Sequence, residues 1–424
     1  MIKILRQFNE KEIFDRSTPT VDVSSIVRDI IDDVRGNGDE ALRKYSSKFD
    51  KVELQSFEID VSLMKEAYDN SQPEFKAVLE QAAANIREYH SAQINEGYEI
   101  NRSNGVKIGR KVLPLERVAL YVPGGTAAYP SSVLMNSIPA KIAGVDEIIM
   151  TTPPSADGTI RNDILAAAYI GGVDRLFCIG GAQAVAAVAY GTESVPKVDK
   201  IVGPGNAFVA EAKRQVYGVV DIDMIAGPSE ILVIADNSAN PVAVAADMLS
   251  QAEHDKNATA VLITTDEALA QATAKEIESQ LSLLPREEIA RVSIDNNGKI
   301  IIAESISDAI DISNRLAPEH LEICTENAID LLPLIRNAGS VFLGNNCPEA
   351  VGDYFSGTNH VLPTGGTARF ASALSVEDFV KTIEYTYYPR EALIEDADKI
   401  AMFASREGLD AHARSATVRK ELYK

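Results

Sequence analysis

Glu319 and His320 form a dipeptide whose two side chains are well suited to moving protons. Pro318 precedes them and disfavours a helix, and the apolar residues that follow predict a short strand beginning at this point. A carboxylate beside an imidazole, where a loop enters a buried strand, can act as a general acid or base near neutral pH. A structural pairing of the same two side chains fits equally well, so the pattern leaves both roles open.

A second set of polar residues, scattered along the chain, could bind a cation. Two of them stand three positions apart on one face of a predicted helix, two lie in a glycine-rich segment, and one lies far towards the C-terminus. Nitrogen and oxygen donors of this kind suit zinc or a harder divalent cation. Solvated polar groups are the alternative at each position, and the last residue would need its segment docked elsewhere or onto a second subunit. The candidates are Gln251, His254, Asp353, His360 and His412.

Apolar strands that alternate with helices are expected to position these residues. One series runs over residues 117–217 and a second over 231–343. Alternation of this kind predicts parallel, doubly wound sheets of the α/β class.

The segments outside these two series have their own patterns. Amphipathic helices are expected at 24–49 and 72–90, with His90 at the polar, surface-facing end of the second. The glycine-rich residues 344–366 are expected to form a long loop of the functional kind, and the chain is expected to be helical after residue 376.

Three predicted strands of the first series end in glycine-bearing turns, at residues 123–125, 180–183 and 203–206. Ligands of such sheets bind beyond the carboxyl ends of the strands, where helix N-termini offer N–H groups to anions. A dinucleotide is the expected ligand. Tight strand-to-helix turns without a ligand are the alternative, and the usual GxGxxG fingerprint is absent from the sequence.

Length and composition exclude several classes of protein. A chain of 424 residues is expected to fold as more than one domain, and its net charge of −21 argues against a nucleic-acid partner. The N-terminal residues lack the pattern of a signal peptide, and no apolar run is long enough to cross a membrane. The three cysteines match no zinc or redox motif, so we expect a cytoplasmic protein with reduced thiols. The sequence also contains no nucleophile elbow, Walker loop or HExxH motif.

Nine short phrases, taken together and in order, resemble the histidinol dehydrogenase family. They extend over essentially the whole chain, and their combination is specific although each phrase alone is not. The phrases are Tyr121–Gly125, Gly180–Ala184, Val198–Asn206, Ala226–Glu230, Leu249–His254, Ala317–Leu321, Gly352–Tyr354, Gly357–Thr364 and Ala411–Arg414.

The resemblance implies a fold, a reaction and an assembly. It implies two Rossmann-like domains with small N- and C-terminal helical segments, in a zinc-dependent homodimer with shared active sites. The implied reaction oxidises L-histidinol to L-histidine with two NAD+, as the last step of histidine biosynthesis. The expected boundaries are an N-terminal arm at 1–20, one domain at 21–120 plus 235–375, a cofactor-binding domain at 121–234, and a tail at 376–424 that reaches the partner subunit.

The resemblance also implies roles for particular residues. His320 would take the proton of the alcohol, and Glu319 would activate the water that hydrates the aldehyde. The segments with Glu407 and His412 would come from the partner subunit. The implied zinc ligands are Gln251, His254, Asp353 and His412; the cofactor residues are Tyr121, Gln183 and Asn206; the substrate contacts are Ser229, Gln251, His254, His320, Asp353, Glu407 and His412.

Other functions compete with this interpretation. A related dehydrogenase of another small polar alcohol, such as sulfopropanediol, would use the same scaffold. A metal-dependent hydrolase without a nicotinamide and a non-catalytic binding protein are the rivals from other classes. Cys324 or Cys347 could instead form a thiohemiacetal with the aldehyde, although neither belongs to a recognisable nucleophile motif.

Overall fold

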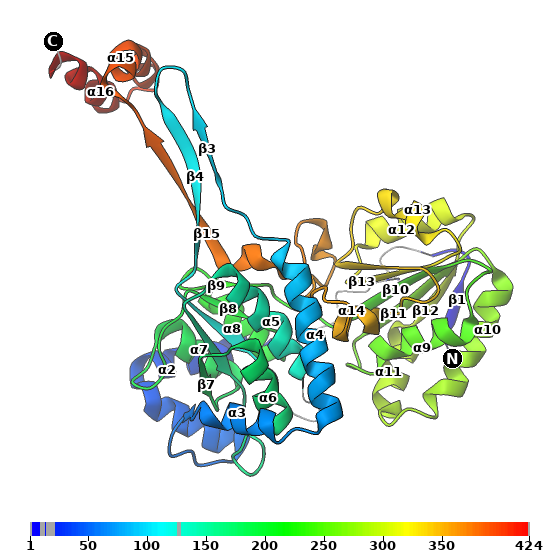
Figure 1. Ribbon diagram of the computed structural model, residues 1–424. Coiled ribbons are helices and arrows are strands. Elements are labelled where there is room, and N and C mark those ends of the chain that lie inside the picture. The colour runs from blue at the N-terminus through cyan, green and yellow to red at the C-terminus, as the bar shows by residue number, and fades with distance from the viewer. Residues whose placement is uncertain (1, 9–12, 14–21, 125–128, 423–424) are drawn as a thin grey trace. The chain divides into compact units, whose positions relative to one another are not determined.

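The computed structural model describes residues 2–8, 13, 22–124 and 129–422, so most of the expected arm at 1–20 lies outside the described residues. The chain divides into two compact units (Figure 1). The first comprises Met1–Gln93 and Leu115–Phe379, and the second comprises Ile94–Pro114 and Val380–Lys424. The first unit contains two separate six-stranded sheets, and each is covered by helices on both faces.

One sheet of the first unit has the strand order β2-β7-β6-β5-β8-β9, in which every pair is parallel except β2 with β7. Its first parallel strand along the chain lies in the middle, so later strands are added on either side of it. The strands are β2 (Glu58–Ile59), β5 (Arg117–Tyr121), β6 (Glu147–Thr151), β7 (Arg175–Phe177), β8 (Lys200–Val202) and β9 (Asp221–Ile222).

Alternate side chains of β5 pack into different cores on the two faces of this sheet. Val118 and Leu120 join the core formed with α3 to α6, whereas Ala119 and Tyr121 join the core formed with α2, α7 and α8. The helices are α2 (Ser24–Tyr45), α3 (Ser62–Asp69), α4 (Pro73–Ser91), α5 (Pro130–Ala143), α6 (Asn162–Gly171), α7 (Gly181–Tyr190) and α8 (Ala207–Val216), and the π-helix η1 (Ser46–Asp50) follows α2.

The other sheet has the order β1-β12-β11-β10-β13-β14, and all of its pairs are parallel. Helices α9 to α11 cover one face, and α12 and α13 lie on the other. The strands are β1 (Lys3–Leu5), β10 (Glu230–Ala235), β11 (Thr259–Thr264), β12 (Lys299–Ile302), β13 (His320–Cys324) and β14 (Ser340–Leu343). The helices are α9 (Pro241–Ala252), α10 (Glu267–Leu281), α11 (Glu287–Asn297), α12 (Ile306–Leu316), α13 (Ala328–Leu331) and the 3-10 turn η2 (Leu332–Leu334).

The two parallel sheets with helices on both faces confirm the predicted α/β class. After β14 the chain forms the short helix α14 (Glu349–Tyr354) and the 3-10 turns η3 (Thr367–Arg369) and η4 (Val376–Phe379). No helix among the described residues is long and apolar enough to span a bilayer.

The second unit is an antiparallel sheet of order β15-β4-β3 followed by two packed helices. Several apolar side chains of its strands are exposed in the single chain, among them Ile100, Ile383 and Tyr387. The elements are β3 (Tyr98–Asn101), β4 (Lys107–Pro114), β15 (Val380–Tyr387), α15 (Arg390–Arg406) and α16 (Asp410–Leu422).

The structure differs from the sequence-based expectations in several places. Helices α2 to α4, which the prediction grouped with the domain that carries Gln251, pack on α7, α6 and α5 of the other sheet. The expected loop 344–366 contains α14, and the segment after residue 376, expected to be helical, forms the 3-10 turn η4 and strand β15 before its two helices. Alternating residues such as Ile383 and Tyr385 were a strand signal that the prediction overlooked. His90, predicted at the surface, is fully buried. Gln93 and Asn359 contact its two ring nitrogens and so satisfy them in the interior.

A buried ion pair fixes the turn that follows β8. The side chains of Lys213 and Asp223 form an ion pair and are 3% and 1% exposed. Lys213 also donates to the carbonyl oxygen of Gly203 at 2.9 Å, and Asp223 accepts the N–H of Gly203 at 2.7 Å. Gly203 has φ +108°, and a Cβ there would lie 2.2 Å from the carbonyl oxygen of Tyr121, so the turn requires glycine.

We expect Asp223→Asn to lower the free energy of unfolding by about 3 kcal/mol, because the substitution leaves the Lys213 charge buried without its counter-ion. Asp221→Asn is the matched control. Asp221 pairs with Lys200 at 3.0 Å but is 53% exposed, and Lys200 keeps a second partner in Asp378 at 3.5 Å, so the loss should cost less than about 1 kcal/mol. Urea unfolding of both variants measures the difference, and equal losses would contradict the structural role of the buried pair.

Candidate active site

The pairing of β13 with β10 places the Glu319–His320 dipeptide. In the parallel register His320 stands beside Ile231, so the peptide groups of Glu230 lie next to the dipeptide. The carbonyl oxygen of Glu230 lies 3.1 Å from Nδ1 of His320, and the N–H of Glu230 donates to Oε2 of Glu319 at 2.8 Å. Because a carbonyl can only accept, Nδ1 of His320 carries a proton. Its Nε2 is buried without a hydrogen-bond partner.

The free Nε2 of His320 faces a carboxylate from another segment. Oδ1 of Asp353, near the end of α14, lies 3.6 Å from this nitrogen, which is too far for a hydrogen bond but close enough for strong electrostatic attraction. On the other side of the ring, Oε2 of Glu319 lies 3.7 Å from Nδ1. His320 is thus held between two carboxylates at 4% exposure.

Burial and charge shift the pKa values of these three groups. Burial alone would lower the pKa of His320, but the Glu319 and Asp353 carboxylates outweigh it and raise the pKa to about 10. Burial raises the pKa of Glu319 to about 7, and the neighbouring His320 and the Glu230 N–H oppose the rise. Burial also disfavours the charged form of Asp353, yet His320 and the other nearby imidazoles keep its pKa below the usual range.

His254, a predicted metal ligand, lies near Asp353, and Gln251, another predicted ligand, stands three residues before His254 at the end of α9. Gln251 lies on α9 and is 1% exposed, and both of its amide atoms are buried without a hydrogen-bond partner. His254 follows α9, is exposed, and contributes to the electrostatic stabilisation of the Asp353 carboxylate. An amide oxygen with no partner, a carboxylate and an imidazole form a donor set that fits a divalent cation such as zinc.

His360, another candidate ligand from the sequence, has a different environment. Its Nδ1 lies 3.1 Å from the carbonyl oxygen of Asp353, and its Nε2 lies 3.3 Å from Oγ of Ser132. Both ring nitrogens are therefore engaged. His360 holds the segment that carries Asp353 and offers no free nitrogen to a metal.

The remaining predicted residues fall in two places. Ser229 directly precedes Glu230 and is partly buried. Glu407, at the C-terminal end of α15, and His412, in α16, belong to the second unit, and both are exposed in the single chain.

Glu349 is a residue of this site that the sequence analysis missed. It is 3% exposed, and its Oε2 has no hydrogen-bond partner. Its carboxylate, the imidazole of His320 and the carboxylate of Asp353 lie within 4.8 Å of one another. The only sequence signal was its position one helical turn before Asp353, and an acidic residue at that spacing is common on any polar helix.

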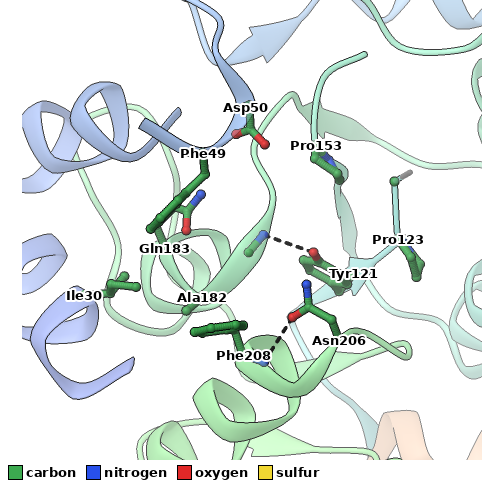
Figure 2. Close-up of a pocket in the computed structure, with 12 residues that line it drawn as sticks. Ile30, Phe49, Asp50, Tyr121, Pro123, Pro153, Ala182, Gln183, Asn206 and Phe208 are labelled. Carbon is green, nitrogen blue, oxygen red and sulfur yellow. Dashed lines mark hydrogen bonds between the residues drawn. The ribbon is translucent and has the colours of Figure 1, made fainter. Parts of the chain in front are cut away.

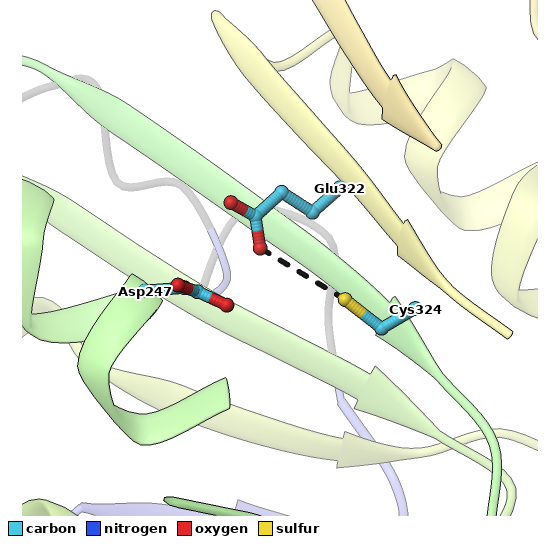
Figure 3. A group of neighbouring side chains, drawn as sticks. All are labelled: Asp247, Glu322 and Cys324. Carbon is cyan, nitrogen blue, oxygen red and sulfur yellow. Dashed lines mark hydrogen bonds between the residues drawn. The ribbon is translucent and has the colours of Figure 1, made fainter. Parts of the chain in front are cut away.

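A second acidic cluster lies on the same face of β13 (Figure 3). Oxygen atoms of Asp247 and Glu322 and the sulfur of Cys324 lie within 4.8 Å of one another. Burial raises the pKa of Glu322 to about 9 and that of Asp247 to about 6. Burial, together with Glu322, also raises the pKa of the Cys324 thiol, which argues against the thiohemiacetal role.

A cavity of about 340 Å³ opens beyond the carboxyl ends of the strands in the other sheet (Figure 2). It lies where β5 and β8 are neighbours, the point at which the order of the strands reverses. All three predicted cofactor residues line the cavity, and two phenylalanine side chains line it as well. The lining residues are Ile30, Phe49, Asp50, Tyr121, Pro123, Gly124, Pro153, Gly181, Ala182, Gln183, Asn206 and Phe208.

Hydrogen bonds within the cavity leave specific groups available for a ligand. The hydroxyl of Tyr121 accepts the N–H of Gly181 at 3.0 Å, and the side-chain oxygen of Asn206 caps α8 by accepting the N–H of Phe208 at 3.0 Å. The Asn206 amide nitrogen is thereby turned into the cavity (Figure 2). Oε1 of Gln183 and Oδ2 of Asp50 are buried without partners. The sequence analysis missed Asp50, because this residue ends η1 and lies far along the chain from the strands beside the cavity.

Comparison with known proteins agrees with this geometry. A sequence model described as histidinol dehydrogenase matches residues 15–420. The chain is 55% identical to the histidinol dehydrogenase of Clostridium acetobutylicum, over 94% of this chain and 92% of that protein. It is 54% identical to that of Streptococcus mutans, over 97% of this chain and 96% of that protein.

Solved structures show the same relationship. The crystal structure of histidinol dehydrogenase from Elizabethkingia anophelis has a TM-score of 0.95 at 38% identity, covering 100% of this chain and 99% of that one. An acetylating aldehyde dehydrogenase from Geobacillus thermoglucosidasius has a TM-score of 0.51 at 14% identity, over 87% of this chain and 94% of that one, which shows a shared fold alone. The chain therefore belongs to the histidinol dehydrogenase family.

Proposed function

We propose that this oxidoreductase converts L-histidinol to L-histidine through histidinal, with two NAD+ and a bound zinc ion. The first step removes a hydride and a proton from the alcohol carbon and oxygen. Water then adds to the aldehyde, and a second hydride transfer yields the carboxylate. The observation that supports this most is the buried, unpartnered Nε2 of His320, with ionisable groups beside it on both sides of the ring.

His320 is the proposed base for the alcohol. Its Nδ1–H is oriented by the carbonyl oxygen of Glu230 at 3.1 Å, so Nε2 is the nitrogen that can exchange a proton with the substrate. The same geometry lets the ring return that proton or pass it to a neighbouring carboxylate.

Glu319 is the proposed base for the water. The N–H of Glu230 holds its Oε2 in place, and its pKa of about 7 leaves a substantial fraction of both protonation forms near neutral pH. A carboxyl with such a pKa can take a proton from water at the aldehyde and release it before the next turnover. Burial at 7% exposure also keeps other water from the reactive aldehyde.

Zinc would be held by Gln251, His254 and Asp353 of one protomer and by His412 of the partner subunit. When bound, the ion would orient the substrate and offset part of the charge of Asp353, which is one of the carboxylates that raise the pKa of His320. The substrate would also contact Ser229 and Glu407.

NAD+ would bind in the cavity beyond β5 and β8. The Asn206 amide and the Gln183 side chain can bond its polar groups, and Phe49 and Phe208 offer apolar faces. The sheet that contains β5 is then the cofactor-binding part, and the sheet that contains β13 carries the acid–base chemistry.

A homodimer with shared sites completes the proposal. Glu407 and His412 are exposed in the single chain, and they belong to the segment that resembles the one exchanged between subunits in the family. A cytoplasmic location and the lack of a nucleic-acid partner are part of the same proposal. The net charge of −21 supports the latter.

We expect about two NADH to form per L-histidinol consumed, because both oxidations occur at one site before release. NADH is measured by its absorbance and histidine by chromatography, and the two amounts give the number of NADH formed per histidine. Removal of zinc with a chelator should abolish turnover, and added zinc should restore it. A ratio near one, or full activity in verified metal-free protein, would contradict the proposal.

We expect Glu319→Gln to slow the oxidation of histidinal by about 100-fold or more, because the amide cannot accept the proton of the water. Oxidation of histidinol to histidinal should fall much less. Single-turnover kinetics with each substrate separate the two steps. Glu326→Gln, at an exposed glutamate just beyond β13, is the matched control. Equal losses in both steps would remove the water-activating role from Glu319.

We expect a mixture of the Glu319→Gln and His412→Asn variants, each of which forms little histidine alone, to recover about a quarter of the wild-type rate of histidine formation after subunit exchange, because half of the dimers then hold one intact site. Glu319→Gln mixed with His320→Asn is the control. Both of these residues come from the same protomer, so every site stays defective. Absence of recovery after exchange has been verified by mass spectrometry would exclude shared sites.

A further inference from the structure

Glu322 is a fully buried carboxyl group in β13 to which the proposed chemistry gives no role. It stands two residues after His320, and alternate residues of a strand project from the same face. The intervening Leu321 and the following Ile323 pack into the apolar core on the opposite face. Glu322 therefore lies on the side of the sheet that carries His320, where an apolar residue would be the ordinary choice.

Two other site-bearing elements contact this carboxyl group. Oε1 of Glu322 accepts the backbone N–H of Glu349, the first residue of α14, at 2.7 Å. Its carboxyl also lies against that of Asp247 on α9 (Figure 3). Glu322 is thus a common contact of β13, α14 and α9.

The spacing along each element connects these contacts to the proposed zinc and acid–base site. Asp353 lies one helical turn after Glu349 on α14, and Gln251 lies one turn after Asp247 on α9. Each residue that contacts Glu322 is therefore one helical turn away from a residue of the proposed site. A displacement of either helix at its contact with Glu322 would move Asp353 or Gln251 by a similar amount.

Protonation of Glu322 makes both contacts favourable. Burial, together with the neighbouring Asp247, raises its pKa to about 9. A neutral carboxyl group accepts the Glu349 N–H through one oxygen and can donate its own proton to Asp247 through the other. Burial likewise raises the pKa of Asp247, and the bond from Glu322 opposes that rise, as expected for an acceptor.

We propose that Glu322 is a positioning residue that holds α9 and α14 against β13 and thereby sets the spacing of Gln251, His320 and Asp353. The inference rests on the proposed zinc site for its effect on metal binding, but the contact with Glu349 can be tested independently of zinc. Glu322 touches neither substrate nor cofactor in this role.

The test compares Glu322→Gln with Glu322→Leu in the full-length enzyme. Glutamine can still accept the Glu349 N–H through its oxygen and donate to Asp247 through its amide, whereas leucine can do neither. Asp247→Ala breaks only the link to α9, at a position that is partly exposed. Cys324→Ala is the control for local packing, because it removes the bond that Sγ of Cys324 donates to Oε2 of Glu322 at 4.0 Å but leaves both links to the helices.

The first measurement is hydrogen exchange of the segment 347–354 in metal-free protein. We expect exchange at Glu349 to be at least about tenfold faster in Glu322→Leu and unchanged in Glu322→Gln, Asp247→Ala and Cys324→Ala. Wild-type protection in folded Glu322→Leu would overturn the proposal. If Glu322→Leu does not fold, Glu322→Gln decides. Loss of protection throughout the Glu322→Gln protein would overturn the proposal, and wild-type protection of Glu349 in this variant would support it.

The second measurement is zinc affinity by competition with a chromophoric chelator. We expect a loss of about 10- to 100-fold in Glu322→Leu and in Asp247→Ala, and a change within about twofold in Glu322→Gln and Cys324→Ala. Equal affinity in all variants would overturn the positioning role. If wild-type protein itself binds no zinc while the exchange results hold, the zinc proposal fails and the link between β13 and α14 stands.

Discussion

The pairing of β10 with β13 is the constraint on which the proposed acid–base site depends. Its register puts the peptide of Glu230 against the side chains of both Glu319 and His320, and the peptide carbonyl decides which ring nitrogen carries the proton. A slip of the register by one residue would turn His320 to the opposite, apolar face of the sheet. The direction of the free Nε2 is therefore a property of strand pairing, and a local motif would not produce it.

Burial of the charged forms of His320 and Glu319 costs free energy, and the neighbouring charged groups offset this cost. A single buried histidine would lose its proton and a single buried glutamate would gain one, because low dielectric disfavours charge. Placed together, His320 and the carboxylates of Glu319 and Asp353 stabilise one another's charged forms, which explains the high pKa of the ring. Protein interiors tolerate such a network when its members are paired.

Sequence reasoning predicted the α/β class and the strand at His320, because apolar runs bounded by Pro and Gly signal buried parallel strands. The glycine turns predicted a ligand beyond the carboxyl ends of these strands, and the family resemblance named three residues, Tyr121, Gln183 and Asn206, that line the cavity there. The prediction was wrong where the position of a residue depends on tertiary packing. The apolar face of α4 could pack on either sheet, and the partners of His90 in the interior, Gln93 and Asn359, cannot be identified from the pattern around it. Glu322 was treated as part of an ordinary strand for the same reason. Nothing in its neighbours reveals that α9 and α14 meet it.

The two sheets use one physical device to hold their ligand-facing segments. At Gly203 the buried charges of Lys213 and Asp223 bond both the carbonyl and the N–H of one residue, and at Glu230 the same two groups are bonded by His320 and Glu319. A residue whose two adjoining peptide groups are both bonded cannot change its φ or ψ without leaving a buried polar group unsatisfied, which costs on the order of 1–3 kcal/mol for each lost bond. The backbone at both residues is thereby held in place before any ligand arrives. Binding energy then need not be spent on ordering them, and more of it remains for stabilising the transition state.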